Sequence, residues 1–179
     1  LKVNVPAAEV PSLSAVEVPL DAGGKGREPA PAIKLDGKLD EPFWAEAKPT
    51  ALFVNTMSGD AAEFKVTAKA AWDAQNLYVA FEVEDDYLKS TFTKDDDHLW
   101  EQDTIELMID PDGDEKNYFE LQVSPAGKVF DTRYDSRRVP QPFGHVDFNS
   151  GLKDGVGLRG KLNRDVAGQG STGGTAPPW

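Results

Sequence analysis

The central part of the chain alternates apolar and polar residues with a period of two, which is typical of strands with one buried face. The clearest case is residues 63–72, where every second position is apolar: Phe64, Val66, Ala68, Ala70 and Trp72. Residues 73–76 have turn composition, and residues 77–84 alternate again, with Leu77, Val79, Phe81 and Val83 in phase. The pattern predicts an antiparallel hairpin with these apolar side chains in the core.

Further segments continue the same pattern. Strands are expected at residues 104–110, 117–123, 128–134 and 156–162. In the first of these Ile105, Leu107 and Ile109 would be buried, and in the second Phe119, Leu121 and Val123, which leaves Glu106, Tyr118, Glu120 and Gln122 on the opposite face. One helical turn fits residues 41–47, where Pro42 suits a helix start and Phe43 and Trp44 would join the core. We therefore predict an all-β fold, an antiparallel β-sandwich or jelly roll with at most one short helix.

Composition divides the chain into three parts. Residues 1–31 are rich in Pro and Gly and are expected to form a tail or linker, although their valines could let parts of it dock as edge strands. Residues 32–163 carry the strand pattern and form the predicted sandwich. Residues 164–179 form a Gly/Ser/Thr/Pro-rich tail of low complexity.

The charge pattern limits the classes of partner. The 179 residues carry a formal net charge of −12, and the window 82–115 alone holds fourteen acidic side chains against two lysines. That window accounts for the whole net charge, so binding to nucleic acid is excluded and electrostatic binding to an anionic membrane is not expected. The chain has no cysteine, which excludes disulfides, thiolate metal sites and thiol nucleophiles.

The acidic window offers oxygen ligands for a hard cation. Asp85 and Asp86 leave the end of a predicted strand, and Asp103 could join them from a neighbouring one. Calcium prefers such oxygens from separate loops, so these three are the candidate ligands of a structural calcium ion, with exposed loop acids as the alternative. The run at 110–114 fails as an EF-hand loop because its glycine falls at the fourth place and the twelfth place is Leu121, so a solvated turn is expected.

Catalysis is not expected. The chain has only two histidines, His98 and His145, and no nucleophile turn of the G-x-S-x-G type. Carboxylate pairs are abundant, but most lie in loops without apolar neighbours that would raise a pKa.

Trp100 is the most informative residue because it stands in an acidic, polar loop just before a strand, whereas Trp44 and Trp72 are in phase with core positions. An exposed indole can stack on the C–H face of a sugar ring. Planar polar groups nearby can then bind the hydroxyls; the candidates are Glu106, Gln122 and Arg133, with Tyr118 lining the same face as Gln122 by alternation.

Three segments in order resemble family 9 carbohydrate-binding modules. Residues 33–44 (IKLDGKLDEPFW) are similar to that family's I-D-G-x-L-D-E-x-x-W, residues 71–80 (AWDAQNLYVA) to its W-D-x-x-x-L-Y-V hairpin, and residues 100–106 (WEQDTIE) to its W-E-Q-D-S-V-E segment. The resemblance implies a DOMON-related β-sandwich with structural calcium, which binds the reducing end of a β-glucan or xylan between two tryptophans. Trp100 matches the first tryptophan and Glu106 the sugar-binding carboxylate, while no match to the later segment with the second tryptophan follows residue 163.

Two other functions stay open. DOMON-type relatives bind b-type haem through Met with His or Lys, and Met57, Met108, His98 and His145 supply those residue types. A structural or interaction domain of a cell-envelope assembly is the other alternative. The favoured interpretation is a non-catalytic carbohydrate-binding domain, periplasmic or extracellular, whose tails connect it to a lipid anchor or to other domains.

Overall fold

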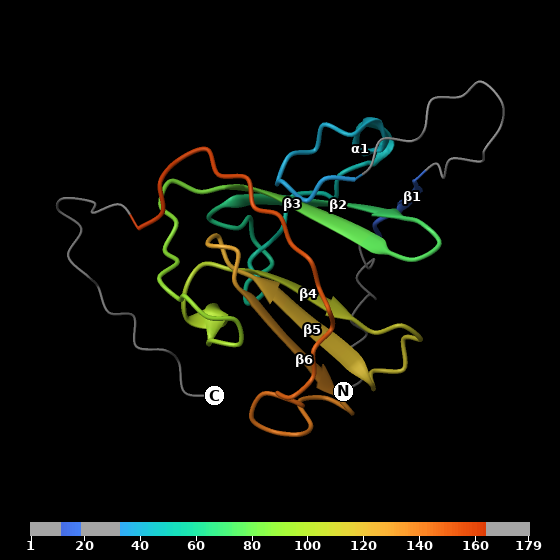
Figure 1. Cartoon of the computed structure of the whole chain (residues 1–179), viewed down its shortest axis with the longest axis vertical. Helices are drawn as coiled ribbons and strands as arrows, with labels where there is room; N and C mark the ends of the chain where they lie inside the picture. Colours follow the sequence, from blue (N-terminus) through green and yellow to red (C-terminus); the bar gives the residue numbers. More distant parts are fainter. Residues whose placement is uncertain (1–11, 19–32, 164–179) are drawn as a thin grey trace, which may run out of the picture. The chain divides into compact units, whose positions relative to one another are not determined.

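The computed structural model describes residues 12–18 and 33–163. The chain divides into two compact units, the first containing described residues up to 86 together with 153–157, and the second containing 87–152 and 158–163. Within residues 12–18 and 33–163, each unit holds one three-stranded sheet, and helix is limited to five residues of α-helix and three of 3-10 helix (Figure 1). The predicted all-β class is confirmed, with the two antiparallel-rich sheets that a β-sandwich requires.

The first sheet has the order β1-β2-β3 and contains the predicted hairpin. Strand β2 (Lys65–Trp72) pairs antiparallel with β3 (Leu77–Glu84). The turn between them is closed by Asp73, whose carboxylate Oδ1 accepts backbone N–H groups from Gln75 and Asn76 at 2.7 and 2.8 Å. Strand β1 (Val16–Glu17) pairs in parallel with the end of β2, which confirms that part of the N-terminal segment docks as an edge strand.

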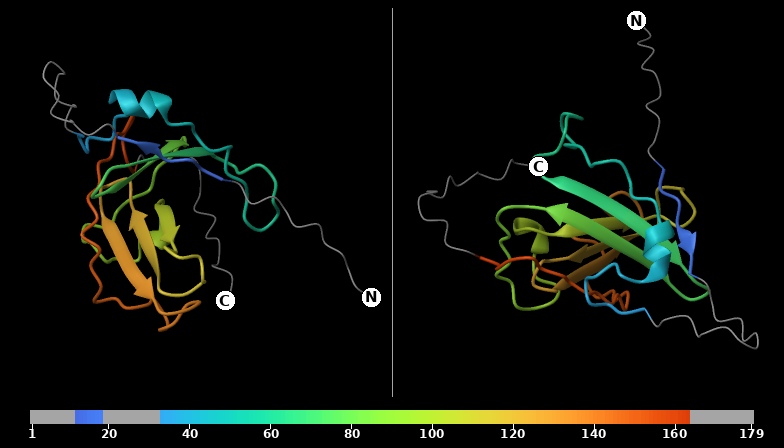
Figure 2. Two further views of the ribbon diagram at one scale, coloured as in Figure 1. Left: turned by 90° about the vertical axis from the view of Figure 1, so that its right-hand side faces the viewer. Right: turned by 90° about the horizontal axis from the view of Figure 1, so that it is seen from above.

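Helix α1 (Pro42–Glu46) covers one face of this sheet, as the left view of Figure 2 shows. Proline at the helix start costs no hydrogen bond because the first helical N–H groups have no partner within the helix. Helix and sheet enclose the main apolar core of the first unit, which consists of Val18, Phe43, Trp44, Ala47 and Ala71. The core position predicted for Phe43 and Trp44 is therefore confirmed, at 6% and 5% exposure.

The phase predicted for this hairpin is only half right. Trp72 is 42% exposed and Leu77 54%, although both were expected in the core. The two are cross-strand partners in the last pair before the turn. Helix α1 packs on the opposite face of the sheet, where Ala71 and Tyr78 lie. The buried alanines of β2 therefore lie on both faces of the strand.

The strand expected at residues 156–162 is absent from the described structure. Instead, residues 153–157 run beside the loop at 35–37, backbone against backbone. A Cβ atom on Gly37, whose φ is +71°, would lie 1.8 Å from the backbone nitrogen of Gly157. The contact therefore depends on glycine on both sides, and a hydrophobic pattern does not report such an approach.

The second sheet is an antiparallel meander of β4 (Ile105–Ile109), β5 (Tyr118–Val123) and β6 (Val129–Tyr134). These strands lie within the predicted ranges. A 3-10 turn, Leu99–Glu101, stands before β4, and its Leu99 is fully buried. Neither α1 nor this turn has the length or the hydropathy to cross a bilayer, and the described residues contain no other helix.

Candidate functional site

One face of the second sheet is polar, and on β5 and β6 it is also the more deeply covered face. The strand register places side chains on it in rows: Glu106, Gln122 and Phe130; then Met108, Glu120 and Thr132; then Tyr118 and Tyr134. We call these eight residues the polar face. Gln122 is 1% exposed and Thr132 0%, whereas the alternate apolar residues of β4 and β5 are only half-buried. The predicted alternation is correct. On β4 the face assigned to the core is the more buried one, whereas on β5 it is the less buried one.

A glutamine bridges two carboxylates at the centre of the polar face. Gln122 Nε2 donates to Glu106 Oε2 at 3.1 Å and to Glu120 Oε1 at 2.6 Å. Burial, followed by the charge of Glu120, raises the pKa of Glu106, while the Gln122 hydrogen bond and the charge of Arg138 lower it. The side-chain oxygen Oε1 of Gln122 is buried without a hydrogen-bond partner. A buried acceptor of this kind costs free energy until a donor reaches it.

Trp100 lies in the 3-10 turn and is 36% exposed. It belongs to an aromatic cluster that we define as His98, Trp100, Phe130 and Phe143. The His98 ring stacks on the indole at a centroid distance of 4.5 Å, and Phe130 and Phe143 each lie 5.0 Å away. Because Phe130 is the cross-strand neighbour of Gln122, Trp100 stands at the edge of the polar face. The acidic run around Trp100 suggested little apolar surface to contact, but β6 and the loop after it supply that surface.

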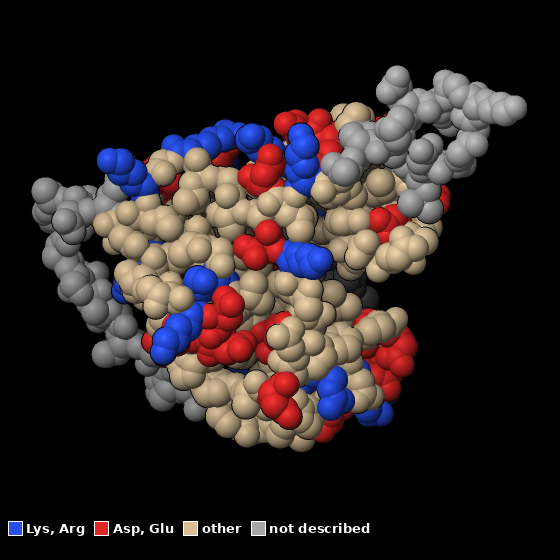
Figure 3. All heavy atoms as spheres, viewed as in Figure 1, with Lys and Arg blue, Asp and Glu red and all other residues tan. Residues whose placement is uncertain are grey.

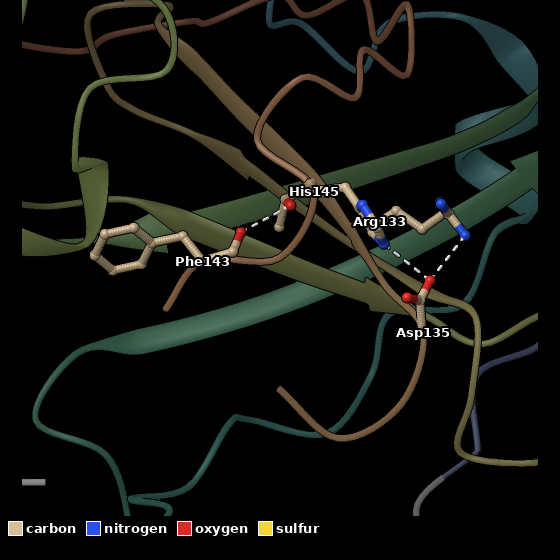
Figure 4. A network of polar contacts seen from close by, with 5 residues as sticks. Arg133, Asp135, Phe143 and His145 are labelled. Carbon is tan, nitrogen blue, oxygen red and sulfur yellow. Dashed lines mark hydrogen bonds and ion pairs between the residues drawn. The ribbon is translucent and has the colours of Figure 1, made fainter. Parts of the chain in front are cut away.

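The loop at 140–145, which carries Phe143, is fixed to β6 on both of its sides (Figure 4). The buried Thr132 hydroxyl donates to the Phe143 carbonyl at 2.8 Å. The His145 backbone N–H donates to the Arg133 carbonyl at 2.9 Å, and its Nε2 lies 2.9 Å from Asp135 Oδ1. These contacts place Phe143 on the side of the polar face and the His145 ring beside Asp135.

Arg133 is not brought to the polar face. It occupies the opposite phase of β6, opposite Phe119, and its Nη1 lies 3.1 Å from Asp135 Oδ1. The cation that does act on this face is Arg138, whose charge lowers the pKa of Glu106. Of the proposed sugar-binding set, Glu106, Tyr118 and Gln122 share one face, with Trp100 at its edge, and Arg133 lies apart.

Tyr118 and Tyr134 close the far end of the polar face. Their rings are stacked with centroids 5.1 Å apart, and the Tyr118 hydroxyl accepts the backbone N–H of Arg138 at 2.9 Å. Burial, followed by the charge and hydrogen bond of Glu120, raises the pKa of Tyr134 to about 12. Alternation could have revealed Glu120 and Tyr134. Arg138 and Phe143 come from the loop after β6, which has no periodic signal.

The candidate calcium ligands lie in different parts of the chain. Asp85 and Asp86 directly follow β3 in the first unit. Asp103 belongs to the second unit, where its Oδ2 accepts the backbone N–H of Lys89 at 2.6 Å. That these three residues bind one calcium ion therefore stays a prediction.

A different acidic group gathers in the turn after β4. Among the described residues, Asp110, Asp112 and Asp114 each offer an oxygen within 4.8 Å of the others. Asp110 already accepts the backbone N–H groups of Gly113 and Glu115 at 3.0 and 2.8 Å. These bonds lower the pKa of Asp110, as expected of a carboxylate that orders its own turn.

The residues that would ligate haem are occupied otherwise or exposed. Met57 is 86% exposed and Met108 52%. His98 stacks on Trp100 with its Nδ1 3.2 Å from Glu101, and His145 holds Asp135. This arrangement gives haem binding no support.

Charge on the visible surface is mixed. On the face drawn in Figure 3, acidic and basic side chains are interspersed. Several form exposed pairs, such as Lys65 with Glu84 at 3.1 Å and Lys116 with Asp114 at 3.8 Å. Such pairs contribute little to stability, about 0–1 kcal/mol each.

Comparison with known proteins gives a consistent result. The model of the family described as "Carbohydrate family 9 binding domain-like" matches residues 35–137. Exoglucanase XynX of Acetivibrio thermocellus is 32% identical over 124 residues, which cover 69% of this chain and 10% of that protein. Endo-1,4-beta-xylanase A of Thermoanaerobacterium saccharolyticum is 29% identical over 124 residues, again 69% of this chain and 10% of the relative. Endo-1,4-beta-xylanase A of Thermotoga neapolitana is 32% identical over 88 residues, 48% of this chain and 8% of the relative.

The chain thus spans about a tenth of the length of these curated relatives. No solved structure matches it. The matched region contains α1 and strands β2 to β6, including Trp100 and the polar face. The chain therefore belongs to the carbohydrate family 9 binding domain-like family, which consists of carbohydrate-binding modules rather than catalytic domains.

Proposed function

We propose that the chain binds a poly- or oligosaccharide at the polar face of its second sheet. Trp100 stacks on the pyranose ring, and Glu106 and Gln122 bind its hydroxyls. The observation that carries this proposal is the partly exposed indole of Trp100 at the edge of a face that presents the exposed Glu106 carboxylate. Gln122 Oε1 on the same face is buried and has no donor, so the hydrogen bonding of this face is incomplete.

The roles differ with exposure. Trp100 at 36% exposure keeps indole surface free for an apolar contact, although His98 already stacks on the ring. Glu106 is exposed on its strand and spends one oxygen on Gln122, so the other oxygen can accept from a hydroxyl. Tyr118 borders the same face, with its hydroxyl held by Arg138. A carboxylate, an amide and an aromatic plane together form a site typical of sugar recognition.

The ligand class that we propose is a glucan or xylan. The relatives that share the matched region are named an exoglucanase and endo-1,4-beta-xylanases. An accessory domain of such enzymes would hold the chain on its polysaccharide. Such a ligand lies outside the cell, so we also propose a periplasmic or extracellular location, with attachment to other domains or to a lipid anchor.

Affinity electrophoresis on gels with soluble xylan or β-glucan, followed by calorimetry with xylo- and gluco-oligosaccharides, tests the proposal. The variant Trp100→Ala should abolish retardation because the ring contact is lost. The matched control is Trp72→Ala, which removes an indole of similar exposure, 42%, from the first sheet. Melting temperatures of both variants establish that they remain folded.

Retardation that survives in Trp100→Ala, or that is lost equally in Trp72→Ala, would contradict the assignment of the site. A second variant, Glu106→Gln, keeps the side-chain shape and should lower affinity without altering the fold. Failure of the wild-type chain to bind any glucan or xylan would refute the glycan class itself.

We propose, from the chemistry of the donors, that carboxylates of the acidic window hold a structural calcium ion, with Asp103 in the second unit and Asp85 and Asp86 in the first unit as separate candidate ligands. Carboxylate oxygens are the ligands that calcium prefers, and Asp103 keeps one oxygen free of its bond to Lys89. The ion would stabilise the folded chain by mass action. Calcium should therefore raise the melting temperature of chelator-treated protein, and an Asp103→Asn variant should lose this gain. An unchanged melting temperature on chelation would refute the calcium site, and loss of the gain in Asp112→Asn instead would assign it to the turn after β4.

A further inference from the structure

The polar face offers hydrogen-bond acceptors and few donors. Glu106 and Glu120 are both carboxylates, and both N–H groups of the Gln122 amide are engaged between them. At the centre, Gln122 Oε1 is a further acceptor, which is buried and has no hydrogen-bond partner. A ligand that satisfies this face must therefore bring donors.

We propose, on the basis of the function proposed above, that this face selects uncharged sugar units and rejects units that carry a carboxylate, the uronic acids. A neutral pyranose supplies hydroxyl donors to the exposed Glu106 carboxylate, which spends only one oxygen on Gln122. A uronate brings a further anion and further acceptors to the same place. The discriminating group is Glu120, which is 9% exposed and is joined to Glu106 through the bridging amide of Gln122.

The cations near the polar face do not outweigh the negative charge of its carboxylates. Arg138 lowers the pKa of Glu106, but its effect is smaller than that of Glu120, and both are smaller than the effect of burial. Lys128 is committed to Asp95 at 3.8 Å. His98 lies against Trp100 with Glu101 3.2 Å from its Nδ1. The balance of charge at Glu106 is therefore acidic.

The expected size follows from Coulomb's law. A ligand carboxylate about 6 Å from one site carboxylate, at an effective dielectric constant of about 40, is repelled enough to weaken binding roughly tenfold. Salt screens this repulsion, whereas the binding of a neutral sugar depends little on ionic strength. The discrimination should therefore shrink between low and high salt.

The experiment compares calorimetric affinities for three ligands: an unsubstituted xylo-oligosaccharide, the same oligosaccharide with a glucuronic acid unit, and the methyl ester of that acid. The methyl ester matches the acid in shape and lacks its charge. We expect the ester to bind about as well as the neutral ligand and the free acid about tenfold more weakly at low salt. The variant Glu120→Gln should bring the free acid within a few-fold of its ester, while Glu84→Gln, an exposed carboxylate of β3, should change nothing.

The outcomes separate the two proposals. Equal binding of acid and ester by the wild-type chain overturns the charge selection and leaves sugar binding intact. No binding of any of the three ligands overturns the proposed function. A preference for the ester that persists unchanged in Glu120→Gln also overturns the inference, because the repulsion would then arise elsewhere.

Discussion

Replacing Gln122 by Met tests the bridge between the two carboxylates directly. Methionine has nearly the volume of glutamine, so the substitution removes the amide without opening a cavity. The Nε2 group loses its bonds to Glu106 and to Glu120, and the unpaired Oε1 disappears at the same time. The change therefore isolates the polar contribution of one buried side chain, 1% exposed in the wild type.

The magnitude follows from exposure. The bond to Glu120, at 2.6 Å and almost buried, is charge-assisted, and its loss costs about 2 kcal/mol. The bond to the exposed Glu106 carboxylate adds about 1 kcal/mol. Removal of the unpaired acceptor returns about 1 kcal/mol. We expect Gln122→Met to lower the free energy of unfolding by about 2 kcal/mol at pH 7.

The loss of unfolding free energy in Gln122→Met should depend on pH, and the pKa of Glu106 determines whether the loss grows or shrinks as the pH rises. This pKa lies above its ordinary value of 4.5 in the folded state, so the folded chain binds the proton more tightly than the unfolded chain. Charged Glu106 therefore costs stability as the pH rises through the folded pKa. Gln122 reduces that cost by donating to the charged form, and without it the folded pKa rises further. The destabilisation by Gln122→Met should be largest near pH 7 and shrink below pH 4.5.

Urea unfolding at pH 7 and pH 4 measures the difference. The matched control is Gln102→Met, since Gln102 bonds only to the backbone and hydroxyl of Thr91, at 2.6 and 2.7 Å. No carboxylate takes part in those bonds, so the cost of the control should be the same at both pH values. A Gln122→Met penalty that is independent of pH, or smaller than that of the control, would refute the bridge as a source of stability.

Other substitutions address the loop over β6 and the core. Thr132→Val removes the buried donor to the Phe143 carbonyl and should cost about 1–2 kcal/mol in urea unfolding, with a change in tryptophan fluorescence because Phe143 contacts Trp100. Gly144→Ala should destabilise far more than Gly151→Ala in thermal melts, because both glycines have positive φ but only at the former would a Cβ meet an atom, Thr132 Oγ1 at 2.5 Å. Equal melting temperatures for the two alanine variants would contradict the close packing of that loop.

The strands were predictable from the sequence because their period is set by the pleat. The ranges of β2 to β6 follow the alternation closely, and helix α1 begins at the proline that marked it. Local rules of this kind need no knowledge of the partner surface. They establish which residues share a face, and the placement of Glu106 and Gln122 on one face is an example.

What the alternation could not tell was which face would be the more buried. The apolar phase of β4 and β5 is half-buried, and the polar phase holds the fully covered Gln122 and Thr132. That cover is a product of tertiary structure: the 140–145 loop reaches the face through Thr132, and its glycine approaches the same side chain. The same limit explains why Trp72 was assigned to the core and is 42% exposed.

The loop residues of the site had no signal of their own. Phe143 and Arg138 lie between the last strand and residue 149, in a stretch with two proline peptide bonds and no period. Each is held by a single hydrogen bond that only the folded chain brings together. The Phe143 carbonyl accepts from the Thr132 hydroxyl, and the Arg138 backbone N–H donates to the Tyr118 hydroxyl. Arg133, by contrast, was assigned by proximity in sequence and lies on the opposite phase of β6.

A covered polar face is costly, and this cost is itself an argument for a ligand. The first unit buries its apolar side chains around α1, as a stability-driven core does. The second unit instead buries a glutamine with an unpaired oxygen between two carboxylates, which disfavours folding relative to an apolar packing of the same volume. A chain that needed only a stable sheet would gain by replacing the glutamine and both carboxylates together with apolar residues, whereas removal of the glutamine alone leaves the carboxylates without their bridge. The arrangement is explained if the unpaired oxygen and the carboxylates serve a hydroxylated ligand that restores their hydrogen bonds on binding.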